Sequence, residues 1–178
     1  MYEVDSKDKV LKLDSLPPSC CGAPLPVVLK NEQSTLIAYV IQNRIQDWDR
    51  SSSPRLVEPD SDAESIAIVR FVFARAIMFG PPNDEAFHGH PLASRGLKPY
   101  GVFEVLHSSW IRKLERMNSV HDRHRPERYQ SLRHFVLSFH DSTFECVAED
   151  LKLVEVFRGS MTQALARMTS LLAESDRR

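Results

Sequence analysis

The sequence predicts an α+β domain in which a largely antiparallel sheet with hairpins is covered by two main helices. Its apolar runs are short, and polar turns of the hairpin type separate several of them. Only two segments carry a clear helical stripe, so the chain lacks the alternating strands and helices that a parallel sheet requires. With 178 residues, of which 42% are hydrophobic, the chain is long enough to bury one sizeable core.

Residues 1–22 are expected to form an extended or mobile segment that precedes a single α+β domain over residues 23–178. The start of the chain mixes charged and apolar side chains and lacks the continuous apolar stretch of a signal peptide. The prolines at positions 17, 18, 24 and 26 disfavour helix and lead the chain toward the domain in extended form.

Three strands are predicted in the first half of this domain. Two apolar runs between Val27 and Gln42 flank the polar residues 30–35, a pattern typical of a hairpin. Residues 47–64 are rich in serine, proline and acids, which indicates a solvated connection, with disorder as the alternative. Residues 65–79 are apolar on both faces and rich in β-branched and aromatic side chains, which favours one long central strand over a helix.

The second half opens with an irregular loop, because residues 80–99 contain four prolines and three glycines. The helix expected at 109–118 places Trp110 and Leu114 on one face, and Ser108 or Ser109 caps it. The helix expected at 160–173 begins with a capping box formed by Ser160 and Gln163. Further strands are expected at 101–106, 134–139, 144–148 and 151–157, with a turn at 140–143.

Two polar clusters contain the candidate functional residues, one in the 80–99 loop and one in the 140–143 turn. Carboxylates and imidazoles act as acids, bases or ligands, and the prolines restrict the conformations of the loop. We expect the two clusters to meet at one rim of the sheet and form a polar ligand-binding site. The candidate ligand-binding residues are Asn83, Asp84, Glu85, His88, His90, His140 and Asp141. The alternative is a surface loop in which Asn83 and Asp84 cap a helical turn, and a turn in which Asp141 bonds its own backbone.

An enzyme is a second possibility, and no catalytic residue is assigned for it. A metal-assisted hydrolase would use His88, His90 and His140, with Glu85 or Asp141 as a ligand or base. However, the sequence contains no HExxH motif and no paired CxxC motif, so no metal or other cofactor is expected. Cys146 alternates in phase with Phe144, which indicates a buried packing residue rather than a nucleophile.

Charge patterning suggests a third class, an interaction or regulatory protein of the immunity type. Residues 112–133 contain seven Lys or Arg against three acids and form a candidate partner surface. The partner is expected to be a small molecule or a protein. Nucleic acid is disfavoured by the net charge of -1, and a membrane by the shortness of the apolar segments. Cys20 and Cys21 are adjacent and would pair only through a strained bridge, which favours a reducing cytoplasm.

Three strings of the sequence resemble a group of small uncharacterised bacterial proteins. They are GAPLP near Gly22, FGPPNDEAFHGHPL from Phe79 and RHFVLSFHDSTFEC from Arg133. The resemblance covers about half of the chain and implies a soluble bacterial protein, but it brings no activity, cofactor or catalytic residue. The two longer strings contain the two polar clusters, which favours treating these clusters as one site.

Overall fold

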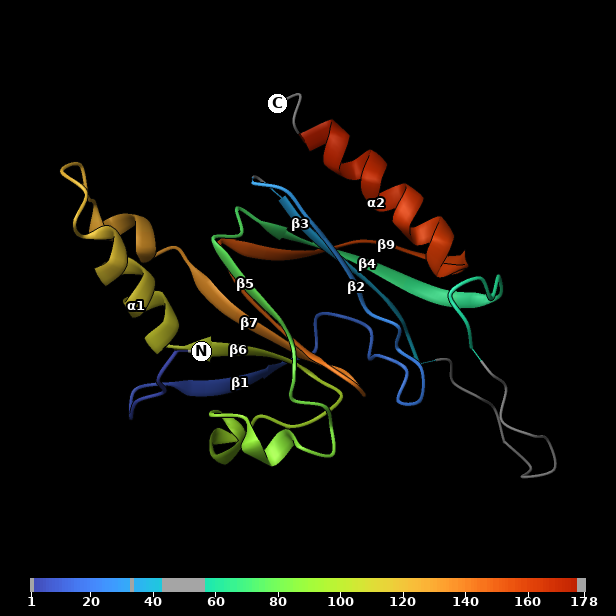
Figure 1. Cartoon of the computed structure of the whole chain (residues 1–178), viewed down its shortest axis with the longest axis horizontal. Helices are drawn as coiled ribbons and strands as arrows, with labels where there is room; N and C mark the ends of the chain where they lie inside the picture. The colour runs from blue at the N-terminus through green and yellow to red at the C-terminus, as the bar shows by residue number, and fades with distance from the viewer. Residues whose placement is uncertain (1, 33, 43–56, 176–178) are drawn as a thin grey trace.

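The computed structural model describes residues 2–32, 34–42 and 57–175, which form two antiparallel sheets and two α-helices (Figure 1). This architecture confirms the predicted α+β class. The five-stranded sheet has the order β1-β6-β7-β8-β5, and the four-stranded sheet has the order β2-β3-β4-β9. The strands are β1 (Lys9–Leu13), β2 (Val27–Lys30), β3 (Ser34–Val40), β4 (Glu64–Val72), β5 (Ala76–Gly80), β6 (Val102–Leu106), β7 (Arg133–Ser138), β8 (Thr143–Ala148) and β9 (Asp150–Gly159). The helices are α1 (Ser109–Asn118) and α2 (Met161–Ser175), with 3-10 turns η1 (Phe87–Gly89), η2 (Ala93–Arg95) and η3 (Pro126–Tyr129).

The main core lies between the facing sides of the two sheets. Phe71 of β4 packs against Phe135 and Phe144, with ring centroids 5.9 and 5.1 Å away. Cys146 lies in the same core and is fully buried, as its phase with Phe144 predicted. The inward-facing residues of β7 and β8 therefore follow the strand period of two.

The strand expected over residues 65–79 is two strands, β4 and β5. Paired with β9 and β8, they form one bent two-stranded ribbon that links the two sheets. The chain crosses from β4 to β5 at Phe73, whose φ is 49°, while β8 continues into β9 on the partner side. Hydrogen bonds from Arg75 N to Val147 O (2.7 Å) and from Glu149 N to Val72 O (2.9 Å) carry the pairing through the corner. The single-strand prediction is wrong because a strand that changes sheets stays apolar on both sides of its bend.

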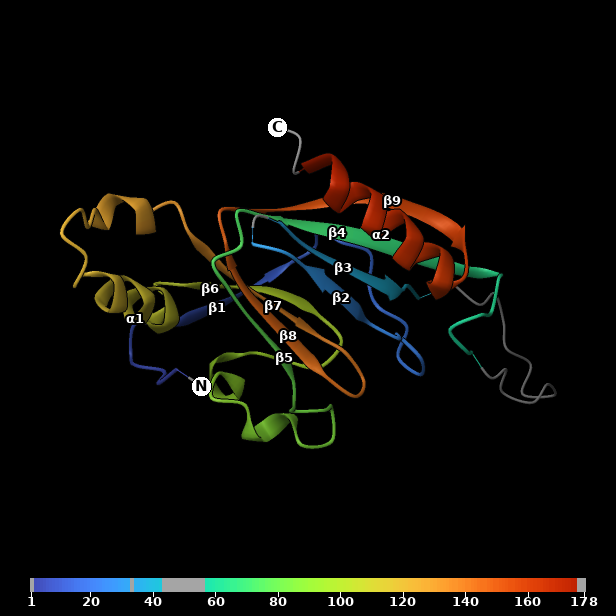
Figure 2. The ribbon, with the colours of Figure 1, turned by 45° about the horizontal axis from the view of Figure 1, so that its top comes forward.

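Helix α2 covers the outer face of the four-stranded sheet (Figure 2). Met161, Ala164 and Met168 pack against apolar side chains of β3 and β4. The predicted capping box is present: Gln163 N donates to Ser160 Oγ, and Ser160 N donates to Gln163 Oε1, each at 3.2 Å. The expected helix is therefore confirmed, ending two residues later than predicted.

Helix α1 and the 80–99 segment pack on the outer face of the five-stranded sheet. Ile111 N donates to Ser108 Oγ (3.3 Å), so the predicted N-cap and helix are both confirmed. Phe87, Leu92 and Trp110 belong to one buried cluster on this face. This cluster fixes the 80–99 segment against the sheet, although beyond the end of β5 the only regular structure of the segment is the two 3-10 turns.

The N-terminal segment, which was expected to be extended or mobile, contains the edge strand β1 of the five-stranded sheet. β1 pairs with β6 along its whole length, and Tyr2 is 4% exposed. Val10 and Leu13 of this edge strand are half-buried, each against a different core cluster, and its other three residues are exposed. Of the connection predicted at 47–64, residues 47–56 lie outside the described residues. Among the described residues, no helix combines the length and apolarity needed to cross a bilayer.

Candidate functional site

The 80–99 segment and the 140–143 turn lie against each other at one end of the five-stranded sheet. Asp84 N donates to His140 O (2.8 Å), and Thr143 Oγ1 donates to Pro82 O (2.9 Å). Antiparallel pairing of β5 with β8 places Gly80 opposite Thr143, so the loop leaves the sheet where the turn begins. The topology therefore brings together two segments that are some fifty residues apart in the chain.

Three side chains form a hydrogen-bonded site at this end of the sheet: Asp84, Tyr100 and His140. The Tyr100 hydroxyl donates to Asp84 Oδ2 and lies 2.9 Å from His140 Nδ1, which is 3.0 Å from the same carboxylate oxygen. The Tyr100 and His140 rings stack with centroids 6.4 Å apart.

Sequence reasoning missed Tyr100, although strand register offered a signal for it. Val102 of β6 pairs with Leu137 of β7, so the residues just before β6 lie beside the end of β7 and its following turn. Tyr100 occupies that position with a φ of 58°, in the left-handed region.

The Asp84 carboxylate is the charged centre of this site. The hydrogen bond from Tyr100 lowers the pKa of Asp84, and the bond from His140 lowers it further. The same carboxylate raises the pKa of Tyr100 to about 12. Asp141 Oδ1 lies 3.9 Å from His140 Nε2, so the imidazole has a carboxylate near each of its nitrogens. The site is therefore acidic at neutral pH.

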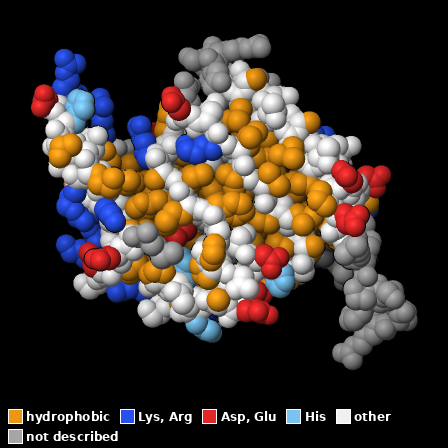
Figure 3. All heavy atoms as spheres, in the orientation of Figure 1, with side chains coloured by type: hydrophobic (Ala, Val, Ile, Leu, Met, Phe, Trp, Pro, Cys, Tyr) orange, Lys and Arg blue, Asp and Glu red, His pale blue; other side chains and the backbone are white. Residues whose placement is uncertain are grey.

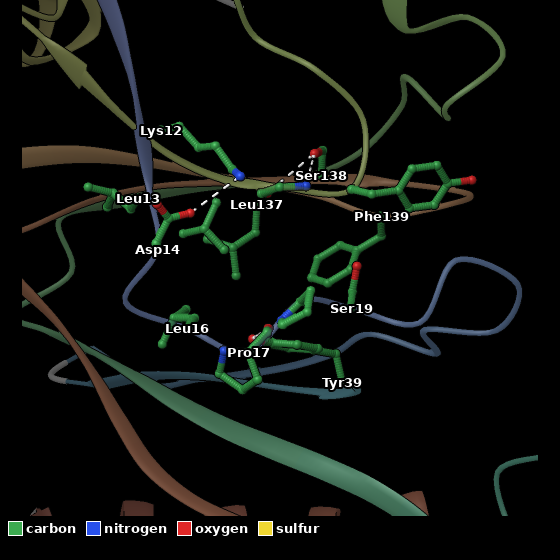
Figure 4. A pocket seen from close by; sticks show the side chains of 14 residues that line it. Lys12, Leu13, Asp14, Leu16, Pro17, Ser19, Tyr39, Leu137, Ser138 and Phe139 are labelled. Atoms are coloured by element: carbon green, nitrogen blue, oxygen red, sulfur yellow. Dashed lines mark hydrogen bonds and ion pairs between the residues drawn. The ribbon is translucent and has the colours of Figure 1, made fainter. Parts of the chain in front are cut away.

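A cavity of about 270 Å³ adjoins the site between the ends of the two sheets (Figure 4). Leu137 and Phe139 extend from one side, and Pro17 and Tyr39 lie on the other. Tyr100 also lines the cavity and so connects it to the hydrogen-bonded site.

Most polar side chains of the cavity wall already have partners. Tyr39 donates its hydroxyl proton to Pro17 O (2.8 Å), and Ser138 Oγ donates to Lys98 O (2.8 Å). Lys12 and Asp14 form an exposed ion pair with Nζ and Oδ1 3.3 Å apart, which Figure 4 shows at the edge of the cavity. The interior therefore offers mainly apolar surface to an occupant.

The other predicted loop residues have separate roles or none that the structure shows. Asn83 Oδ1 accepts a hydrogen bond from Ala86 N (3.0 Å) in the turn before η1, while η1 itself has no side-chain cap. Glu85 and His88 are exposed. His90 is buried and lies in a different cluster, so the structure brings together only part of the predicted set.

That second cluster surrounds Glu145, which is 3% exposed. Its carboxylate accepts hydrogen bonds from Tyr2 Oη (2.6 Å), His134 Nε2 (2.9 Å) and His90 Nε2 (3.3 Å). His134 Nδ1 in turn lies 2.9 Å from the hydroxyl of Ser108, the N-cap of α1. The sequence did not lead us to predict this cluster. Alternation along β7 and β8 does place His134 and Glu145 on the opposite face of the sheet from the core residues Phe135 and Cys146.

The hydrogen bonds of His90 indicate which of its ring nitrogens carries the proton. Leu92 N donates to His90 Nδ1 (3.1 Å), so this nitrogen carries no proton and Nε2 donates to the carboxylate. Burial alone raises the pKa of Glu145, but the bonds from His134, His90 and Tyr2 outweigh it and lower the pKa to about 2. Glu145 is therefore a buried carboxylate held in its ionised form by three donors.

The structure does not assemble the histidines of the metal-site alternative. His90 contacts Glu145, His140 contacts Asp84, and His88 is exposed. Within residues 2–32, 34–42 and 57–175, no group of three or more His, Cys, Asp and Glu side chains is arranged to hold a metal ion.

Comparison with protein-family models, curated proteins and solved structures found no match for this chain.

Proposed function

We propose that this protein binds a small amphipathic molecule that carries a cationic group. Its apolar part would occupy the cavity, and its cationic group would lie at the site formed by Asp84, Tyr100 and His140. The observation that carries the proposal is the double position of Tyr100, which lines the cavity and donates a hydrogen bond to Asp84. The Asp84 carboxylate does not itself line the cavity, so a cationic group would have to extend past Tyr100 to reach it.

The size and lining of the cavity favour a compact apolar group. A volume of about 270 Å³ lies just below the range of roughly 300–1,000 Å³ found for ligand pockets. Leu13, Leu137 and Phe139 supply apolar contacts, and Pro17 restricts the conformations of the neighbouring wall. A single aromatic ring with a short chain matches this space.

The charges at the rim favour an ammonium group over a carboxylate. The hydrogen bonds from Tyr100 and His140 keep Asp84 ionised, and Asp141 lies beside the same imidazole. Lys12, at the edge of the cavity, is paired with Asp14. An anionic ligand would be repelled at this rim, whereas a cation would be attracted.

Binding has more support than metal-assisted hydrolysis, the enzyme alternative. His90 is bonded to Glu145 in the interior and shares no partner with His140, so the ligands expected for a metal are separated. The three cysteines are free thiols, which supports a reducing compartment such as the bacterial cytoplasm as its location.

Calorimetric titration with 2-phenylethylamine and with 3-phenylpropionate tests the proposal. We expect the amine to bind at least about tenfold more tightly than the acid. Asp84→Asn should remove this preference, and Leu13→Phe, which narrows the cavity, should weaken both probes. Asp122→Asn, in an exposed loop elsewhere, is the matched control. Failure of the amine to bind, or an equal effect of the control, would contradict the proposal.

A further inference from the structure

We propose that helix α1 and turn η3 form a docking site for an acidic segment of a partner protein. An apolar side chain of that segment would lie in the groove between the two elements. We call residues 109–129 the basic arm. Figures 1 and 2 show this arm projecting from one side of the sheets. The proposal does not depend on the ligand site at Asp84, which lies on a different part of the five-stranded sheet.

Positive charge is concentrated in and beside the basic arm. Residues 112–133 contain seven Lys or Arg and three Asp or Glu, whereas the whole chain contains 23 and 24. The remainder of the chain is therefore net negative. Figure 3 shows most of the Lys and Arg atoms of that face over the arm, and acidic atoms at the opposite end of the molecule. Such a distribution attracts and orients an acidic partner.

Most of the basic side chains in the arm are available for a partner. Arg112 is paired with Asp5, and Arg133, just beyond the arm, is paired with Glu104, in both cases with an N–O distance of 2.5 Å. The remaining ones have no side-chain hydrogen bond or ion pair within the part of the chain that the structure describes. They are Lys113, Arg116, Arg123, Arg125 and Arg128.

A groove of about 390 Å³ runs between α1 and η3. Leu114, Tyr129 and Leu132 give it an apolar floor, and these three side chains are partly or fully buried. Arg75 and Arg128 line it as well, both exposed and without an ion-pair partner among the described residues. The groove thus combines space for an apolar side chain with two guanidinium groups that fit carboxylates.

Exposed apolar side chains extend this surface toward the tip of the arm. Met117 also lines the groove and is 64% exposed, and Val120 is 87% exposed. Exposed apolar side chains of this size mark interaction sites, and methionine and arginine are enriched in protein interfaces.

A protein segment fits these features better than a nucleic acid or a membrane does. Glu115, Asp122 and Glu127 interrupt the basic side chains, and the net-negative remainder of the molecule repels an extended polyanion. Trp110 is buried against the sheet, and Leu114 is partly buried in the same cluster, so the arm lacks a broad exposed apolar face for lipid. A single apolar side chain flanked by carboxylates matches the groove.

Fluorescence anisotropy with the full chain tests this proposal. The probe is a labelled peptide of Glu and Asp with one central Phe, compared with a Phe→Ala peptide and with a peptide in which Gln replaces the acids. We expect saturable binding of the first peptide and a loss of about tenfold in affinity for each altered one. The double variant R75Q/R128Q should lose about as much, whereas K30Q/K152Q, which removes two charges on other elements, should bind normally.

The outcomes separate the possible partners. The proposal is overturned if the Phe peptide does not bind, or if both double variants weaken it equally. Tighter binding of a DNA duplex or of phosphatidylserine vesicles than of the peptide would assign the arm to nucleic acid or to membrane instead. Circular dichroism confirms that each variant is folded, and Met117→Ser probes the groove without changing charge.

Discussion

His90 and Glu145 are in contact in the interior, with Nε2 of the imidazole 3.3 Å from Oε1 of the carboxylate, although 55 positions separate them in the chain. The contact fastens the 80–99 segment to a central strand of the five-stranded sheet. The same loop supplies Asp84 to the ligand site, so this buried contact holds the loop that positions Asp84. Buried structure and candidate site are therefore coupled through one segment.

Acid should weaken the protein through Glu145. Its pKa is about 2 in the folded chain, against 4.5 for an unperturbed glutamate side chain. A depressed folded pKa contributes stability above pH 4.5 that is lost as pH falls toward 2, about 3 kcal/mol in all. Urea unfolding of the wild type and of Glu145→Gln measures this contribution. We expect the difference in unfolding free energy to be largest near neutral pH and to narrow below about pH 4. A constant difference would show that Glu145 does not titrate in this way.

His88 and His90 are neighbours in the loop but should respond differently to replacement. His90 is 4% exposed and bonded at both ring nitrogens, so His90→Ala should lower the unfolding free energy by about 2–3 kcal/mol. His88 is exposed, and His88→Ala should change it by less than about 0.5 kcal/mol. Chemical denaturation of the two variants measures both changes in unfolding free energy. Equal effects would mean that the Glu145 contact contributes little.

Tyr2 should stabilise the fold despite its position at the start of the chain. Its ring stacks on Trp110 with centroids 5.3 Å apart, and its hydroxyl donates to Glu145 (2.6 Å). Tyr2→Ala should therefore cost about 3–4 kcal/mol, whereas Lys7→Ala in the same segment should be nearly neutral. The comparison is made by urea unfolding. A Tyr2→Ala variant as stable as the wild type would show that the N-terminal segment is dispensable.

The local elements could be predicted because their signals are local. Ser108 and Ser160 marked the starts of the two helices, and the turn at 140–143 marked a hairpin. Alternation along β7 and β8 also predicted the burial of Cys146. Caps, turns and periodicity act over a few residues, so a single sequence contains them.

Long-range pairing could not be predicted in the same way. β1 is held by β6, some ninety residues later, and nothing within β1 itself specifies that partner. No glycine or proline marks the corner at Phe73, where the chain changes sheets. The cluster around Glu145 joins the β7–β8 hairpin to Tyr2 and His90, which are far from it in the chain, and only the assembled fold brings these three segments together.

The candidate site could be predicted only in part. The meeting of the 80–99 loop and the 140–143 turn was expected, and contacts of Asp84 and Thr143 show that the segments adjoin. Which loop residues face the turn depends on the backbone path between the prolines, so His90 was assigned to a rim from which it turns inward. Tyr100 was missed because its role depends on the register of β6 with β7.

The ionisation of Tyr100 should report directly on its bond to Asp84. The hydrogen bond to Asp84 is the largest cause of the raised pKa of Tyr100, which is about 12 against 10.0 for an unperturbed tyrosine. Asp84→Asn removes the negative charge, so the pKa of Tyr100 should move down toward 10.0. Absorbance of the phenolate during alkaline titration measures the change, and Tyr100→Phe identifies which part of the curve belongs to this residue. Asp141→Asn is the control, because this carboxylate contributes least among the causes of the shift. If Asp84→Asn leaves the Tyr100 transition where it is, the hydroxyl is not bonded to Asp84 in solution, and the link between cavity and carboxylate on which the binding proposal depends is lost.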